Sequence, residues 1–295
     1  MTDYLVYDVF TDTPFGGNQL AVIPDARGLK ETDLQRIAAE FNFSEVTFVY
    51  PPKDKAHTAR VRIFDPANEL PFAGHPTIGT AIALSDLGTD DNMVLELGVG
   101  PIPCKVTKGT PTTAEFTTTV PLEILEIIDL TLIANCLSLP KEAISTENHP
   151  PQRASVGLPF VLIELTDLGV LAQAAPITEA FKLCEQQYPS KVDLFATFAY
   201  VKTKTGIQAR MFAPLSNIPE DPATGSASAA LGAYLTALTG HTQTLEIAQG
   251  VEMGRPSKIF VSTTIDNGQP SSVTVRGSAV KTMQGRFTFS KQIPK

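Results

Sequence analysis

The chain repeats one pattern of residues at two places about half its length apart. The first copy begins at 62–66 with Arg-Ile-Phe-Asp-Pro, and the second at 210–214 with Arg-Met-Phe-Ala-Pro, an offset of 148 residues (210 − 62) in a chain of 295. A loop follows in each copy, and then a run of small and hydroxylated residues. Solenoids and propellers repeat every 20–50 residues or so, far more often than this. The repeat therefore predicts a duplicated domain.

Each copy predicts a strand, a loop and a helix that begins at small residues. The first turn of such a helix presents backbone N–H groups that have no partner inside the helix, together with a partial positive charge, and both suit a carboxylate. Gly98 and Gly250, each followed by Val, extend the repeat beyond the helix. One helix start in each half predicts a cleft between two similar domains that binds a small acid.

The composition is that of an ordinary globular protein. A length of 295 residues favours about two domains. The net charge of −8 and pI of about 5.1 argue against nucleic acid or an anionic membrane as the main partner. No apolar run approaches the ~20 residues of a membrane span, and residues 1–10 lack the basic start of a secretory signal. We expect a cytoplasmic protein.

The three cysteines, Cys104, Cys136 and Cys184, form no CxxC motif and lie far apart in the sequence. Their number is odd, which does not suit a framework of disulfides. We interpret them as small core residues in a reducing compartment.

Hydrophobic spacing predicts an α+β fold. Residues 31–41 place apolar side chains three and four apart, as in an amphipathic helix. Most predicted strands alternate, which favours mixed or antiparallel sheets, each wrapped around one of the small-residue helices. The further predicted helices are 176–187 and 226–238, and the later predicted strands include 155–165, 193–202, 206–213, 274–281 and 286–290.

The domain limits follow from the position of a Pro-, Ile- and Leu-rich stretch, 121–150, which we interpret as the crossover between the halves. We expect an N-terminal domain of residues 1–125 and a C-terminal domain of residues 126–282. The C-terminal segment 283–295 is expected to return to the first domain.

Glu45 is the first candidate for chemistry. It stands at the entry of an apolar strand, just after the predicted helix 31–41. Partial burial there would raise the pKa of its carboxyl group toward the range of a general base. The alternative is a solvated charge at the end of a strand.

His75 follows Gly74 in the loop of the first repeat. The imidazole can donate or accept a proton at a substrate atom, and Gly74 allows the backbone to approach a ligand closely. The alternative for His75 is a histidine near a helix start that is hydrogen-bonded to backbone.

Asp221 occupies the matching loop of the second repeat. It can accept a hydrogen bond from a substrate amine or hydroxyl group, but an Asp before Pro is also a common turn residue. Thr224, Gly225 and Ser226 would offer helix-start donors to a carboxylate. Asn18 and Gln249 lie in further loops of the same halves.

Several kinds of site have no signal in this sequence. The four His and the acidic residues show no metal-ligand spacing. The stretch 74–79 matches neither a phosphate-binding loop nor a dinucleotide fingerprint, and no GxSxG elbow occurs. We therefore expect neither a metal nor a nucleotide cofactor.

The motifs together resemble the PhzF family of phenazine biosynthesis-like proteins over essentially the whole chain. They are Asp8-Val9-Phe10-Thr11 with Gly17-Asn18, Ser44-Glu45-Val46-Thr47-Phe48, Arg62-Ile63-Phe64 with Pro66 to Thr77, Glu220 to Ala227, and Gln249-Gly250 with Met253 to Ser257. The resemblance implies a diaminopimelate epimerase-like fold, in which two pseudo-symmetric domains each wrap a sheet around a central helix.

The resemblance also implies an activity. It implies a cofactor-independent isomerase similar to trans-2,3-dihydro-3-hydroxyanthranilate isomerase, acting on a small cyclic or unsaturated amino or hydroxy acid. Glu45 would be the acid/base, with His75 and Asp221 positioning the substrate; Gly74, Thr224, Gly225, Ser226 and Asn18 would complete the binding site. Partners would be the small carboxylate substrate and a second copy in a homodimer.

Two other kinds of protein share parts of this pattern with such an isomerase. Diaminopimelate epimerases use one cysteine on each domain, and here neither repeat loop contains a cysteine, which excludes a two-thiol racemase. A non-catalytic protein that binds small carboxylates through the same cleft would have the same residues and no turnover.

Overall fold

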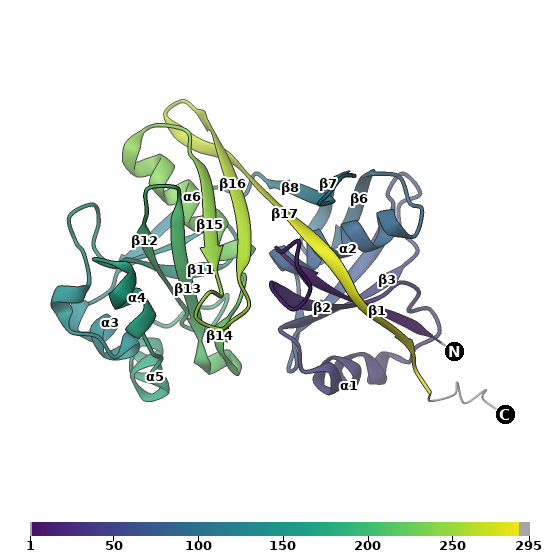
Figure 1. Cartoon of the computed structure of the whole chain (residues 1–295), viewed down its shortest axis with the longest axis horizontal. Coiled ribbons are helices and arrows are strands. Elements are labelled where there is room, and N and C mark those ends of the chain that lie inside the picture. Colours follow the sequence, from purple (N-terminus) through teal and green to yellow (C-terminus); the bar gives the residue numbers. More distant parts are fainter. Residues whose placement is uncertain (1, 289–295) are drawn as a thin grey trace. The chain divides into compact units, whose positions relative to one another are not determined.

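The computed structural model describes residues 2–288 and divides the chain into two compact units. Unit 1 comprises Met1–Thr117 and Arg276–Lys295, and unit 2 comprises Thr118–Val275 (Figure 1). The last strand of the chain, β17 (Gln269–Arg286), begins in unit 2 and ends in unit 1.

Unit 1 is a mixed sheet with two helices. Its strands are β1 (Asp3–Val9), β2 (Asn18–Ile23), β3 (Glu45–Tyr50), β4 (Ala59–Phe64), β5 (Glu69–Leu70), β6 (Asn92–Leu97), β7 (Gly100–Thr107) and β8 (Thr113–Thr118), and its helices are α1 (Glu31–Phe41) and α2 (Gly74–Asp86). The strands pair in the order β17, β1, β2, β3, β4, β6, β7, β8. The β2–β3 and β4–β6 pairs are parallel and the others antiparallel, while the short β5 pairs with β4.

Unit 2 is also a mixed sheet. Its strands are β9 (Glu123–Ile127), β10 (Gln152–Ser155), β11 (Pro159–Glu164), β12 (Thr197–Lys202), β13 (Ile207–Ala213), β14 (Ile218–Asp221), β15 (Thr244–Gln249) and β16 (Ser257–Asp266). They pair in the order β9, β10, β11, β12, β13, β15, β16. Here β11–β12 and β13–β15 are parallel, and the short β14 pairs with β13.

The helices of unit 2 are α3 (Leu130–Leu137), α4 (Leu168–Gln173), α5 (Thr178–Gln187) and α6 (Gly225–Thr239), with short 3-10 turns η1 (Lys141–Ala143) and η2 (Pro214–Ser216). Mixed sheets with helices confirm the predicted α+β class.

The two small-residue helices are buried nearly all round, as the sequence predicts. Twelve residues of α2, Gly74 to Ser85, are buried, and so is most of α6. Small side chains let the helix backbone approach the sheet: a Cβ built on Gly79 would lie 2.6 Å from Leu20 Cδ2 and 2.7 Å from Val9 Cγ2. This close packing fixes where the first turn of α2 stands.

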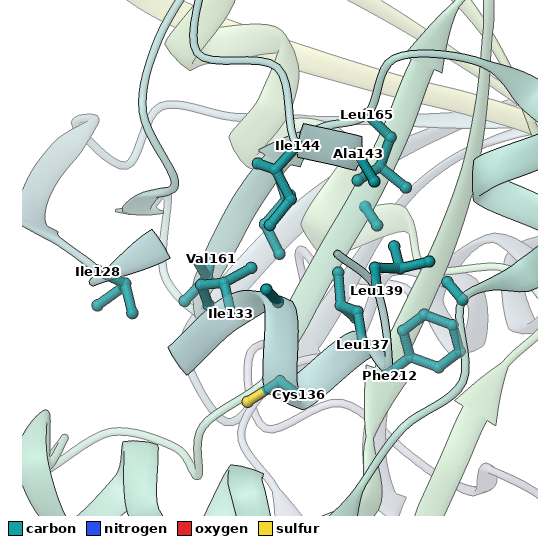
Figure 2. Packing of buried hydrophobic residues seen from close by; sticks show 14 of the residues in the cluster. Ile128, Ile133, Cys136, Leu137, Leu139, Ala143, Ile144, Val161, Leu165 and Phe212 are labelled. Carbon is teal, nitrogen blue, oxygen red and sulfur yellow. The ribbon is translucent and has the colours of Figure 1, made fainter. Parts of the chain in front are cut away.

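Amphipathic helices cover the other faces of the sheets. In unit 1, α1 has the predicted bounds and buries Leu34, Ile37 and Ala38. In unit 2, α3, α4 and α5 cover a larger apolar cluster, part of which is shown in Figure 2, with Ile133, Cys136 and Leu137 on one short helix.

Some predicted elements differ from the structure. The predicted strand 155–165 contains β11, but it begins at the last residue of β10, which pairs with β11 in a hairpin. The hairpin turns at Gly157 with φ +125°, a conformation that favours glycine. The predicted strands 274–281 and 286–290 are one strand, β17, as far as Arg286, and residues 289–290 lie outside the described residues. The crossover 121–150 contains β9, α3 and η1, and α4 was not predicted.

Candidate functional site

Unit 1 brings three of the predicted site residues together. Glu45 is the first residue of β3, whose register with β2 pairs it with Leu20. His75 is the second residue of α2, and its Nδ1 lies 3.2 Å from Glu45 Oε2. The amide Nδ2 of Asn18, at the start of β2, lies 3.3 Å from the same ring nitrogen. We call these three residues the unit 1 site.

All three side chains are withdrawn from solvent. Asn18 is 1% exposed, and the side chains of His75 and Glu45 are 4% and 14% exposed. The alternative of a solvated strand-end charge for Glu45 is therefore wrong. A carboxyl group in such a place loses most of its hydration and depends on its protein neighbours.

Burial lowers the pKa of His75 to about 3, and a hydrogen bond with the backbone of Gln19 opposes this only in part. The imidazole is therefore neutral near pH 7, because the cost of removing a charged ring from water disfavours protonation. Its contact with Glu45 is between a carboxyl group and a neutral ring rather than an ion pair.

The ring of His75 has one nitrogen that the described residues leave without a partner. Nδ1 faces Asn18 and Glu45, whereas Nε2 is buried and has no hydrogen-bond partner. The tautomer of the neutral ring sets the role of Nε2: it carries the proton if Asn18 donates to Nδ1, and it is an acceptor if Nδ1 donates to the backbone of Gln19 or to Glu45. An unsatisfied buried polar atom is costly in a folded protein, so Nε2 is suited to form a hydrogen bond with a bound molecule.

Unit 2 brings together Asp221 and Thr224. Asp221 ends β14 and is 6% exposed. Thr224 precedes α6, and its hydroxyl donates to Asp221 Oδ2 at 2.5 Å. Asp221 thus lies directly before the loop that leads to α6, and it is also a buried acceptor. Both interpretations of the sequence, a turn residue and an acceptor for a substrate group, fit this position.

Gln249 fixes this loop from the end of β15. It is fully buried; its carbonyl oxygen accepts the Thr224 N–H at 3.0 Å, and its amide donates to the Asp221 carbonyl oxygen at 2.8 Å. Ser257 adds a hydrogen bond from its hydroxyl to the carbonyl oxygen of Pro222 at 2.8 Å. The sequence analysis placed Gln249 only in a loop of this half; its one signal is a polar residue on the same face of the strand as Leu245 and Ile247.

A glycine lets the same loop close. Gly250 has φ +70°, and a Cβ there would lie 2.5 Å from the carbonyl oxygen of Arg255 and 2.7 Å from that of Pro222. Any larger residue would push the loop away from β15. Asp221, Thr224, Gly225 and Ser226, with Gln249 behind them, are called the unit 2 site.

Both helix starts lack a side-chain cap. The residue before α2 is Ala73 and the residue before α6 is Thr224, and neither side chain accepts a hydrogen bond from the helix. Their first turns begin at Gly74 and Gly225, as the sequence predicts. Backbone N–H groups of such a turn can serve an anion.

The repeated arginines are structural. Arg62 forms two-pronged hydrogen bonds with both Glu69 and Glu31. Arg210 pairs in the same way with Glu220, and its guanidinium also donates to the backbone carbonyl oxygens of Leu171 and Ala174. Each arginine thus holds the strand and loop that lead to a helix start.

Neither unit shows a cluster of His, Cys, Asp and Glu that would hold a metal ion, as far as residues 2–288 are concerned. Within the same residues, none of the helices has the length and hydropathy of a membrane-spanning segment.

The chain is similar to known proteins over nearly its whole length. The model of the phenazine biosynthesis-like protein family, PhzC-PhzF, matches residues 7–285. The chain belongs to this family. It is 38% identical to an uncharacterized isomerase from Mesorhizobium japonicum, covering 97% of this chain and 98% of the relative. It is 33% identical to the trans-2,3-dihydro-3-hydroxyanthranilate isomerase of Pseudomonas aeruginosa, covering 97% of this chain and 99% of that enzyme.

A solved structure extends the likeness to the fold. A predicted epimerase from Pseudomonas aeruginosa matches with a TM-score of 0.83 and 29% identity, over 98% of this chain and all of the other. The PhzF family membership and the epimerase-like fold expected from the sequence are confirmed.

Proposed function

We propose that the protein is a cofactor-independent isomerase that moves a proton on a small cyclic or unsaturated amino or hydroxy acid. The observation that carries the proposal is the contact between the Glu45 carboxyl group and a neutral, buried His75. The naming of relatives as isomerases supports it. An anthranilate-like acid is the first substrate class to test, because one of these relatives bears that name.

Glu45 is the proposed acid/base. A carboxyl group held at the entry of β3 can accept a proton from a substrate carbon and return it to another position, provided that the substrate is fixed beside it. His75 would form a hydrogen bond through Nε2 with a substrate oxygen or nitrogen, because Nδ1 is already engaged by unit 1 residues.

The unit 2 site would hold the substrate rather than move its proton. Asp221 is an acceptor for an amine or hydroxyl group, and its position is set by Thr224 and Gln249. The uncapped starts of α2 and α6, at Gly74 and at Gly225 with Ser226, are the proposed donors to a substrate carboxylate.

We also infer that the two units derive from one pseudo-symmetric design and that only unit 1 kept a base. Val46 pairs with Phe64 in unit 1, and Thr197 pairs with Phe212 at the repeated position of unit 2. The residue before Val46 is Glu45, whereas the residue before Thr197 is Ala196. With Glu45 as the one proposed base, the same residue would remove the proton and return it.

The test is exchange with solvent deuterium. The wild-type protein, Glu45→Gln and the control Glu40→Gln would be incubated in D₂O with dihydrohydroxyanthranilate and a panel of small amino and hydroxy acids. Glu40 is a matched control because it is an exposed carboxylate at the end of α1. Label and product should appear with the wild type and Glu40→Gln but not with Glu45→Gln.

Two outcomes would contradict the proposal. Turnover by Glu45→Gln would remove Glu45 from the acid/base role. A small acid that raises the melting temperature of the wild type, yet is never labelled or converted, would favour a non-catalytic binding protein.

A further inference from the structure

Two of the three cysteines touch, although 48 residues separate them in the sequence. Sγ of Cys136, in α3, lies 3.4 Å from Sγ of Cys184, in α5, and both side chains are fully buried. Cys104 is different: it lies in β7 of unit 1, where its thiol makes only a long contact of 3.7 Å with the Ile102 carbonyl oxygen. All three are buried core residues, as the sequence predicts, and two of them are in contact.

The surroundings give the two sulfurs unequal acidity. Either thiol can donate to the other. With Cys136 as the donor, the hydrogen bond lowers the pKa of Cys184, and the guanidinium of Arg153 acts in the same direction against burial. The same hydrogen bond and burial raise the pKa of Cys136. Arg153 is held in place by Glu126 at 2.6 Å and by the Tyr188 carbonyl oxygen at 2.9 Å. Cys184 is thus the sulfur that carries negative charge more easily, and a thiolate is the reactive form.

Within residues 2–288, the thiol of Cys104 has no neighbour that lowers its pKa. Burial alone raises the pKa of its thiol to about 12, and no cysteine lies beside it among the described contacts. It provides an internal control within the same chain.

The helix over the pair is weakly anchored. Of the ten residues of α5, only Phe181 and Cys184 are buried, and no side chain caps its N-terminus. Helices this short are marginal unless tertiary packing holds them, and segments with few buried contacts open locally at low cost. Opening of α5 would expose Cys184 without unfolding the sheet beneath it.

We propose that Cys136 and Cys184 are a redox modification site that closes to a reversible disulfide when the protein meets a peroxide. The Cys184 thiolate attacks one oxygen of hydrogen peroxide, which breaks the O–O bond and gives a sulfenic acid and, after protonation, one water. The Cys136 sulfur then attacks the Cys184 sulfur and displaces a second water, with its own proton leaving on that water. Two thiols and one peroxide thus give one disulfide and two waters.

The disulfide would tie α5 to α3. Because one of the two buried anchors of α5 would become covalent, local opening of that helix should become rarer. The bond would change the dynamics of this layer of unit 2 without requiring any residue of the proposed active site to react.

The first measurement is the mass of the folded protein after titration with hydrogen peroxide. The wild type should lose about 2 Da, the mass of two hydrogens, and regain it with dithiothreitol. Peptide mapping without reductant should find a single cross-link between the peptides of Cys136 and Cys184. Cys104→Ser should behave as the wild type. Cys136→Ser should instead accumulate a sulfenic acid at Cys184 that dimedone traps, and Cys184→Ser should form neither product.

Hydrogen exchange gives a second readout on the wild-type chain, so the outcome does not depend on whether a variant folds. Amides of α5 should exchange several-fold more slowly in the oxidised protein than in the reduced one, while those of α1 should not change. Oxidation of Cys104 before the pair, or a cross-link that forms only in urea-unfolded protein, would overturn the proposal. So would unchanged exchange in α5 once the disulfide is present.

Discussion

The side-chain amide of Gln249 donates to the backbone carbonyl oxygen of Asp221 at 2.8 Å, although 28 residues separate the two. Both are buried, and the same amide also donates to the Thr224 hydroxyl at 3.0 Å. The strand end thus sets the position of the loop before α6. In unit 1, Leu97 stands before Gly98, where Gln249 stands before Gly250. The polar residue belongs to the unit 2 site alone.

Gln249→Leu should therefore loosen the unit 2 site. The substitution keeps apolar volume but leaves the Asp221 carbonyl oxygen and the Thr224 N–H buried without their partners, at a cost of about 1–3 kcal/mol for a group left unsatisfied. We expect lower stability in urea unfolding and a weaker affinity for substrate. Gln186→Leu, on the exposed face of α5, is the control. Equal stability of the two variants would show that the hydrogen bonds of Gln249 contribute nothing net.

Asn18→Asp should raise the pKa of His75. A carboxylate placed beside Nδ1 favours the protonated ring, whereas the native amide does not. NMR titration of the His75 ring should show protonation at a higher pH than in the wild type, and the ring of a neutral His75 should move its proton toward Nδ1. Asn18→Leu, which removes the donor without adding charge, separates the two effects. Identical titration of Asn18→Asp and the wild type would mean that Asn18 does not set the protonation of the ring.

The pKa of His75 also predicts how stability depends on pH. In the unfolded chain the ring has a pKa near the ordinary 6.5, while burial lowers it to about 3 in the folded protein. Between these values the unfolded state binds the proton and the folded state does not, so the free energy of unfolding falls as the pH falls. The slope from this one group is about 1.4 kcal/mol per pH unit at most. Glu45 and Asn18 are the side chains that face the ring.

Comparison of the wild type with His75→Gln isolates this contribution. Glutamine does not titrate, so the difference in unfolding free energy between the two proteins should change with pH between about 6.5 and 3 and stay constant above it. Urea unfolding at a series of pH values gives that difference directly. A difference that does not vary with pH in this window would show that His75 is protonated in the folded state as easily as in the unfolded chain.

The sequence predicted the parts of the fold whose signal is local. The 3.6-residue spacing of Leu34, Ile37 and Ala38 gave the bounds of α1, and the small-residue runs gave α2 and α6. The hairpin at Gly157 was missed because its first strand, β10, reads Gln-Arg-Ala-Ser and lacks the apolar pattern of a strand. Strand pairing depends on partners far along the chain, which hydrophobic periodicity does not contain.

The site residues also divide into those with a local sequence signal and those whose contacts join distant parts of the chain. Glu45, His75 and Asp221 were predicted from loop positions and from the family resemblance, and their catalytic roles stay predictions. Three sets of contacts join residues at least 25 positions apart. They are the contact of Asn18 with the His75 ring, the hydrogen bonds of Gln249 with Thr224 and Asp221, and the contact of Cys136 with Cys184. Such contacts become visible only when the register of the strands and the packing of the helices are fixed.

Gly79 shows how closely that packing constrains the unit 1 site. A Cβ at this position in α2 would lie 2.6 Å from Leu20 Cδ2 and 2.7 Å from Val9 Cγ2, on the strands β2 and β1. Gly79→Ala should gain about 1 kcal/mol of helix propensity, yet the overpacked core should cost about 1–3 kcal/mol and displace α2 from β2. Because β2 pairs Leu20 with Glu45, we expect the contact between His75 and Glu45 to lengthen and proton transfer to slow.

The control for this prediction is Gly109→Ala, where the nearest atom to a new Cβ is 3.4 Å away. Melting temperatures and, once a substrate is known, kcat would be measured for both variants. Gly79→Ala should lower both quantities and Gly109→Ala neither. A Gly79→Ala protein as stable and active as the wild type would mean that the sheet yields to α2 without disturbing the entry of β3, and that the helix does not set the geometry of the unit 1 site.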